Sequence, residues 1–323
     1  MKKLISILVA ISLVVLSFAA CAKTEAKPVI GIIQFGSHAS LNNCYQGVLK
    51  GLQEGGIDIN KYTIEYSDSN FDPSVSQTQA NNLVNKKAAV IIAIATPSAV
   101  AAANAAADSG IPVVYCAVTD PQSMANYTNI TGSSDIPNFE KQLEVVVGCM
   151  GRSDLKIGVL SSTEEQSSPI QIENLKKAAT QYVDMEILSS VVADITTIDA
   201  KVNELISRDI DCMINLLDNT IVGKLETNIL PITNEKKIPV FGSEIEQVKL
   251  GCVASASIEY FDVGSAAGSN AARILLGESA DNIPVATISE PHNYYNSEAI
   301  QDMGIIVPAD MNMHDVTKDV VNK

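Results

Sequence analysis

The sequence has no tryptophan, only three histidines and only three arginines among its 323 residues. It also lacks the G-x-S-x-G, H-E-x-x-H and glycine-rich phosphate-loop patterns that mark several large enzyme classes. The absence of a C-x-x-C pair argues against a zinc knuckle or a redox motif. With His38, His292 and His314 as the only imidazole bases, we expect a protein that is not an enzyme and holds no cofactor or metal.

Basic residues are scarce. The chain has 22 Lys and Arg residues against 37 Asp and Glu residues, which gives a net charge of −15. Removal of residues 1–20, which contain two lysines, would bring the charge to −17. Nucleic-acid binding needs a basic face, so we expect no nucleic-acid partner. A repressor would also need an N-terminal helix-turn-helix, at a place where this chain has an apolar run.

The N-terminus has the pattern of an export signal. Two lysines precede an apolar run over residues 4–20, and the run ends at Cys21. Ala19 and Ala20 suit cleavage before a lipid-carrying cysteine, although Phe18 stands where such signals usually have Leu. We therefore predict a lipoprotein signal peptide over 1–20, lipidation of Cys21, and an extracytoplasmic protein anchored to the cell membrane. The alternative is a membrane span, for which the run is slightly short.

The other five cysteines are widely spaced. Cys116 and Cys212 lie in apolar, strand-like runs, where cysteine behaves as a small hydrophobic residue. We expect no dense disulfide framework, although the sequence is compatible with a single disulfide.

Apolar runs and helical patterns alternate along the first half of the chain after a polar tether over 21–28. The expected strands are 29–35, 62–66, 90–95 and 112–118, and the expected helices between them are 41–52, 74–85 and 98–108. This order is typical of a doubly wound parallel sheet.

The same order begins again at residue 155. Strands are expected at 155–160, 185–192, 211–217, 239–241 and 252–256, with helices at 172–182, 198–206 and 219–229. A helix over 260–274, a strand over 284–288 and a short helix near 297–303 follow. We therefore predict an α/β fold of two parallel-sheet lobes, joined near 131–135, 256–259 and 288–292, where small residues suit a hinge.

Polar residues follow most of the predicted strands. Ligands of open α/β sheets bind at the carboxyl ends of strands, so these positions form a candidate site for a polar ligand. The candidates are Phe35, Ser37, His38, Thr96, Ser98, Thr119, Asp120, Asp135, Asp218, Asn219 and Tyr260. Helix capping is the alternative for Thr96, Ser98 and Asn219, and a turn is the alternative for Thr119-Asp120-Pro121.

The chemistry of these candidates suits a zwitterion. Asp218 ends an apolar run, and a carboxylate there can bind an ammonium group. Hydroxyls at 96 and 98, with the dipole of the following helix, can bind a carboxylate. Phe35 and Tyr260 can form an aromatic wall, whereas the helical spacing of Tyr45 favours core packing. An amino acid is therefore the expected ligand.

Several motifs resemble the substrate-binding lipoproteins of ABC transporters of the tryptophan/tyrosine type. They are residues 29–38 (VIGIIQFGSH), 93–99 (AIATPSA), 117–121 (AVTDP), 129–135 (NITGSSD), 218–220 (DNT) and 251–264. The resemblance implies a type I periplasmic-binding-protein fold and delivery of a solute, with aromatic amino acids favoured, to an ABC permease. Ser133-Ser134 and residues 259–261 depart from the pattern of that family.

The resemblance, together with the alternation of predicted strands and helices in both halves, implies a division of the chain into two lobes. We expect an N-terminal lobe over 29–132 plus 258–289 and a C-terminal lobe over 133–257 plus 290–323. A sugar or nucleoside receptor on the same fold is the alternative function. The few arginines, Arg152, Arg208 and Arg273, are not at strand ends, which disfavours a sugar.

Overall fold

The computed structural model describes residues 26–288 and 291–318. The predicted signal peptide and the predicted lipidation site at Cys21 lie outside these residues. Within them, no helix is both long enough and apolar enough to cross a membrane. The described cysteines, which begin at Cys44, are all buried and free.

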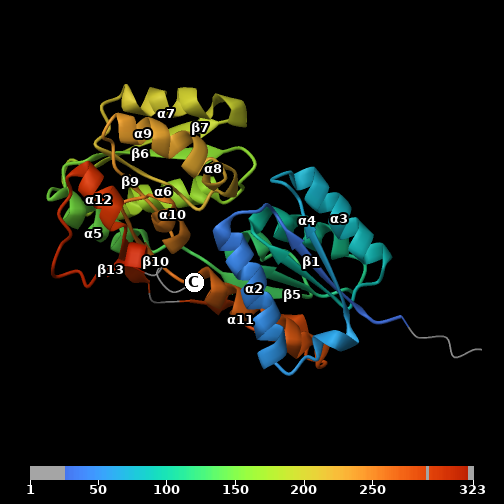
Figure 1. Cartoon of the computed structure of the whole chain (residues 1–323). Coiled ribbons are helices and arrows are strands. Elements are labelled where there is room, and N and C mark those ends of the chain that lie inside the picture. The colour runs from blue at the N-terminus through green and yellow to red at the C-terminus, as the bar shows by residue number, and fades with distance from the viewer. Residues whose placement is uncertain (1–25, 289–290, 319–323) are drawn as a thin grey trace, which may run out of the picture.

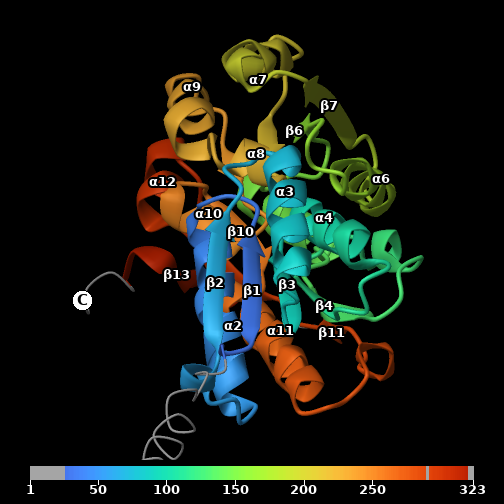
Figure 2. The same ribbon diagram turned by 90° about the vertical axis from the view of Figure 1, so that its right-hand side faces the viewer.

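The first sheet has six parallel strands in the order β11-β5-β4-β3-β1-β2. The strands are β1 (Val29–Gln34), β2 (Thr63–Asp68), β3 (Val90–Ile94), β4 (Val113–Cys116), β5 (Ile130–Ser134) and β11 (Ala286–Thr287). Helices α2 (Ala39–Glu54) and α11 (Tyr260–Leu275) cover one face, and α3 (Pro73–Asn85) and α4 (Thr96–Ala106) cover the other. We call this body the N-terminal lobe (Figures 1 and 2).

Both faces of the first sheet are buried, and the residues of β3 show why. Val90, Ile92 and Ile94 pack in the hydrophobic cluster under α2 and α11, whereas Ile91 and Ala93 pack in the cluster under α3 and α4. Successive side chains of a strand point to opposite faces, so a continuous apolar run requires a layer of helices on each side.

Helices α2 and α11 are far apart in the sequence and pack backbone against backbone (Figure 1). A Cβ atom on Gly47 or Gly51 would lie 2.1 Å from a carbonyl oxygen of α11. A Cβ atom on Gly264 or Gly268 would lie 2.1 to 2.2 Å from a carbonyl oxygen of α2. The glycines therefore permit the close approach that joins residues 260–275 to the N-terminal lobe.

The second body, which we call the C-terminal lobe, contains a four-stranded parallel sheet and a three-stranded sheet. The parallel sheet has the order β7-β6-β8-β9, with β6 (Lys156–Ser162), β7 (Glu186–Val192), β8 (Cys212–Ile214) and β9 (Val240–Phe241). The smaller sheet contains β10 (Ala254–Ser257), β12 (His292–Tyr295) and β13 (His314–Asp315). The helices are α5 (Phe139–Met150), α6 (Ser168–Ala179), α7 (Ile198–Ile206), α8 (Asn219–Val222), α9 (Leu230–Glu235), α10 (Ile245–Leu250) and α12 (Ser297–Met303).

The predicted α/β architecture is confirmed, because the parallel sheets of both lobes place their strands in the same 2-1-3-4 order. Two of the differences from expectation concern predicted elements of the C-terminal lobe. Residues 252–256, expected as a further strand of the second parallel sheet, contribute β10 to the three-stranded sheet, where β10 pairs antiparallel with β12. The single helix expected over 219–229 is instead α8 followed by a π-helical turn over Leu225–Ile229.

The chain passes between the lobes after β5, after β10 and after β11. The last passage includes residues 289–290, which the structure does not describe. Ser133 and Ser134, expected at the start of the C-terminal lobe, lie in β5 of the six-stranded sheet. The division of the lobes at particular residues stays a prediction.

Candidate functional site

Direct hydrogen bonds join the two lobes where the carboxyl ends of their strands meet. Each bond pairs a residue at or near the start of α2 with a residue at or near the start of α8 or α10. The pairs are His38 Nε2 with Asn219 Oδ1 at 3.0 Å, Ser40 Oγ with Glu244 Oε1 at 3.0 Å, and Asn43 Nδ2 with Glu246 Oε1 at 2.9 Å. The cleft between the lobes is therefore closed.

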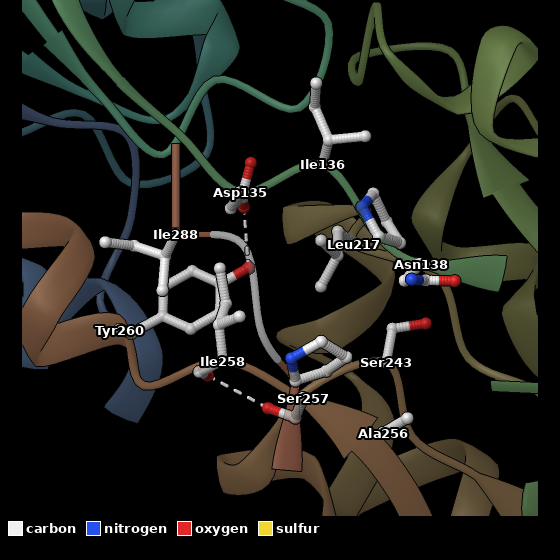
Figure 3. A pocket seen from close by; sticks show the side chains of 12 residues that line it. Asp135, Ile136, Asn138, Leu217, Ser243, Ala256, Ser257, Ile258, Tyr260 and Ile288 are labelled. Atoms are coloured by element: carbon white, nitrogen blue, oxygen red, sulfur yellow. Dashed lines mark hydrogen bonds between the residues drawn. The ribbon is translucent and has the colours of Figure 1, made fainter. Parts of the chain in front are cut away.

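Two small cavities lie inside the closed cleft, with volumes of about 30 and 10 Å³. A more open hollow of about 610 Å³ also lies between the lobes, with Phe71 on its N-terminal-lobe side and Lys224 on its C-terminal-lobe side. Three residues line both cavities: Asp135, Leu217 and Tyr260. Figure 3 shows the larger cavity, with Leu217 near the middle of the group and Asp135 joined to Tyr260. The volumes of the two small cavities are far below the 300–1,000 Å³ of ordinary ligand pockets, so a ligand reaches Asp135 only when the lobes part.

Asp135 directly follows β5 and is 4% exposed. Its Oδ2 accepts a hydrogen bond of 2.6 Å from the Tyr260 hydroxyl. Burial raises the pKa of Asp135, although the hydrogen bond from Tyr260 acts in the opposite direction. Its Oδ1 is buried and has no hydrogen-bond partner. A buried acceptor without a donor is costly, so this oxygen is the strongest single sign of a ligand position.

No lysine or arginine is among the described residues that line the two cavities. The site therefore holds buried acids without a basic side chain to compensate them. Such a site favours a ligand that carries its own positive charge, because an unpaired buried carboxylate is strongly disfavoured.

A second buried acid reaches across the cleft through an amide. Glu165 Oε2 accepts a hydrogen bond of 2.7 Å from Asn219 Nδ2, which leaves Asn219 Oδ1 to accept from His38 Nε2. Burial and then the charge of Asp218 raise the pKa of Glu165 to about 8. Burial lowers the pKa of His38 to about 4, so the imidazole is neutral and its Nδ1 is buried without a partner.

Glu244 is the acid that the C-terminal lobe contributes to the smaller cavity, and it is 2% exposed. It caps α10 by accepting from the amides of Glu246 and Gln247 at 2.7 and 2.9 Å. Its third donor, the Ser40 hydroxyl, comes from the N-terminal lobe. Burial raises the pKa of Glu244 to about 7.

Asp218, the predicted partner of an ammonium group, does not line either cavity. Its carboxylate accepts from Ser162 N at 2.6 Å, Ser162 Oγ at 2.9 Å, Ser168 Oγ at 2.7 Å and Ile221 N at 3.1 Å. Both oxygens are therefore used within the C-terminal lobe, where Asp218 caps α8. The contact of Asp218 with a ligand stays a prediction, and the geometry favours Asp135 for that role.

Five other predicted residues lie away from the two cavities. Phe35 is fully buried in the core, and Ser37 is exposed. Thr96 and Ser98 are buried at the start of α4, and the Ser98 hydroxyl lies 3.2 Å from that of Ser76. Asp120 caps the 3₁₀ turn that follows it. Their ligand contacts stay predictions.

The structure brings His38, Thr119, Asp135, Asn219 and Tyr260 together, all of which were predicted. It adds residues that sequence reasoning did not select, namely Ser40, Leu217, Glu244 and Gln247 in the cavities and Glu165 behind them. Glu244 stands in a polar segment after a predicted strand, so a signal for it was present. Leu217 carried no signal beyond its place at the end of an apolar run.

Two doubly wound lobes, closed on a cleft at the carboxyl ends of their strands, define a periplasmic-binding-protein fold of type I. The chain belongs to the ABC transporter substrate binding protein family, whose model matches residues 29–316. It is therefore a substrate-binding protein of an ABC transporter, a class of proteins that act outside the cytoplasm and bind solutes rather than transform them.

Individual relatives agree with this assignment. The chain is 32% identical over 289 residues to a tyrosine-binding protein of Clostridioides difficile strain R20291, covering 86% of this chain and 82% of that protein. It is similar to a Streptococcus pneumonia ABC domain in complex with L-Trp, with 28% identity, a TM-score of 0.82, and 88% and 97% of the two chains covered.

A third relative is a substrate binding protein with adhesive properties from Clostridium difficile in its ligand-free, open structure. The identity is again 28%, with 89% and 98% of the chains covered, but the TM-score is 0.65. At equal identity the chain superposes better on the complex than on the open structure, as the hydrogen bonds across the closed cleft lead us to expect.

Proposed function

We propose that this substrate-binding protein binds an L-amino acid, with aromatic amino acids favoured, in the cleft between its lobes. The observation that carries the proposal is Asp135, which lines both cavities and has a buried Oδ1 without a hydrogen-bond partner. An α-ammonium group supplies both the missing donor and the missing positive charge. The names of the relatives, tyrosine-binding and in complex with L-Trp, support the same class of ligand.

Neutral groups are available for the α-carboxylate. Asn138, Ser243 and Ser257 line the larger cavity, and the two serine hydroxyls would exchange their present hydrogen bonds within the protein for a bond to the ligand. The start of α4 is a further candidate, because no side chain caps it and its N-cap residue Ala95 has a φ of 76°. Uncapped amide groups and the helix dipole attract an anion, which agrees with the predicted contacts at Thr96 and Ser98.

We also propose that lipid at Cys21 anchors the mature protein to the outer face of the cell membrane, where it delivers its ligand to an ABC permease. The sequence around Cys21 supports this part of the proposal. A Cys21→Ser variant should move from the membrane fraction to the soluble fraction and lose labelling by a radioactive fatty acid. Retention of both properties would contradict the anchor.

The ligand class is tested by thermal unfolding of the protein, purified in mild detergent, with panels of amino acids, sugars and nucleosides. A ligand at about 100 times its Kd stabilises the folded state by about 2.7 kcal/mol, which raises Tm measurably. We expect L-tyrosine or L-tryptophan to raise Tm, and 3-(4-hydroxyphenyl)propionate, which lacks the amine of tyrosine, to have no effect. Stabilisation by a sugar or nucleoside alone would contradict the proposal.

A further inference from the structure

Leu217 is an apolar residue of the C-terminal lobe that packs into the N-terminal lobe. It is 7% exposed and belongs to the same hydrophobic cluster as Leu41, Ala117 and Tyr260. The residue before it, Leu216, is fully buried in the core of its own lobe. Leu217 is therefore an interlobe contact, whereas its neighbour is an ordinary core residue.

The backbone of Leu217 is held in place from both sides by one amide side chain. Gln171 on α6 accepts from Leu217 N at 3.0 Å through Oε1 and donates to Leu217 O at 3.1 Å through Nε2. Gln171 is 1% exposed and its Nε2 also donates to Ser167 Oγ at 3.0 Å. A position fixed in this way presents its side chain with little freedom to move aside.

Leu217 borders the space next to Asp135. It lines both cleft cavities, together with Asp135 and Tyr260, and Figure 3 shows the three residues in the larger one. An amino acid bound to Asp135 through its ammonium group projects its side chain from the next carbon atom, within the space bordered by these residues. The apolar surface available there comes from Leu41, Ala117 and Val222 as well as Leu217.

We propose that Leu217 is the specificity-determining residue of the cleft, and that the volume of the side chain at position 217 sets the size of the amino-acid side chain accepted. The inference rests on the proposed amino-acid function. A smaller residue at 217 joins the two cavities and admits a larger side chain, and a larger residue blocks the passage between them.

The test compares the dissociation constants of L-tryptophan and L-valine by titration calorimetry for wild type, Leu217→Ala and Leu217→Phe. The quantity of interest is the ratio of the tryptophan constant to the valine constant. We expect Leu217→Phe to raise this ratio at least tenfold and Leu217→Ala to lower it severalfold. Leu217→Met, which is longer than leucine but of similar volume, should raise it less and serves if the phenylalanine variant does not fold.

Leu216→Ala is the matched control, because it is the same substitution one residue earlier in a core that faces away from the cleft. It should lower Tm and leave the ratio unchanged. A ratio that moves in the same direction in the alanine and phenylalanine variants, or stays within twofold of wild type in both, overturns the role of Leu217. A wild-type protein that binds no amino acid overturns the proposed function itself, and the two failures are thus distinguished.

Discussion

Each lobe has a buried aspartate at a strand end, and the two carboxylates differ in the hydrogen bonds that they accept. In the C-terminal lobe, Asp218 receives four hydrogen bonds that use both of its oxygens. In the N-terminal lobe, Asp135 accepts a hydrogen bond from the Tyr260 hydroxyl and retains one buried oxygen without a donor. Both residues are nearly inaccessible, at 0% and 4% exposure.

The difference separates a structural acid from a binding acid. A carboxylate whose lone pairs are satisfied within its own lobe contributes to the stability of that lobe and gains little from a ligand. A buried carboxylate oxygen without a hydrogen-bond donor destabilises the unliganded protein. A ligand that supplies the donor removes this cost, so the unpaired oxygen favours binding. The comparison predicts opposite consequences for two substitutions of the same residue type.

The largest expected effect on stability is that of Asp218→Ala. It removes the cap of α8 and leaves the amides of Ser162 and Ile221 without acceptors in a buried place. We expect the free energy of unfolding to fall by about 3 kcal/mol. Urea denaturation measures it, with Asp120→Ala, which removes the cap of a more exposed turn, as the control. An Asp218→Ala variant that keeps the stability of wild type but no longer binds ligand would contradict this assignment. It would show that Asp218 is the binding acid.

The next effect concerns pH and Glu244. In the closed cleft burial raises the pKa of Glu244 from 4.5 to about 7, and the charge of Glu246 acts in the same direction. Open lobes expose this carboxyl to water and return its pKa toward 4.5, so closure takes up a proton between these values. The stabilisation of the closed form is complete below pH 4.5 and is lost as the pH rises through 7.

Two other titratable groups near the cleft complete the pH prediction. Glu165, with a pKa of about 8, acts in the same direction, and His38 opposes both only below its ordinary value of 6.5. Affinity should therefore fall between pH 6.5 and 8, by at most about tenfold per pH unit for each acid. Calorimetry over this range gives the slope of log Kd against pH. This slope should be smaller for Glu244→Gln and unchanged for Glu173→Gln, a substitution at an exposed position on α6. A full slope in Glu244→Gln would refute the assignment.

The smallest effect is expected from the hydrogen bond between Asn43 and Glu246 at the edge of the cleft. Asn43→Ala removes a bond that exists only when the lobes are closed, so it should weaken ligand binding by about 1 kcal/mol, or roughly fivefold. Asn42→Ala is the control, because the side chain of Asn42 bonds to Gln34 and Ser37 of its own lobe. Equal losses in the two variants would show that the bond across the cleft contributes nothing special to closure.

Much of the fold follows from local patterns in the sequence. Continuous apolar runs such as β3 and helical spacing such as that of α11 predict the elements and their parallel arrangement. The helix α5 was not predicted, although Phe139, Leu143 and Val146 have helical spacing in it and are buried. The strands of the three-stranded sheet were harder to place, because β10 pairs with β12, which lies 35 or more residues later in the chain.

The site is less predictable than the fold. Sequence places polar residues at strand ends but does not say how many donors meet each of them. The donors of Asp218 include Ser162 and Ser168, which precede it by 56 and 50 residues, and Tyr260 follows Asp135 by 125 residues. Asp218, which caps α8, is therefore distinguished from Asp135, which has an unpaired oxygen, only by the packing of segments that are distant in the sequence.

The central claim is that Asp135 binds the ammonium group of an amino acid. Titration of Asp135→Asn with L-tyrosine or L-tryptophan tests it directly, because asparagine retains an acceptor for the Tyr260 hydroxyl and removes the charge. The account predicts a loss of affinity of about 2 kcal/mol or more, at least about thirtyfold, with a Tm of the unliganded protein close to that of wild type. An affinity within threefold of wild type would contradict it.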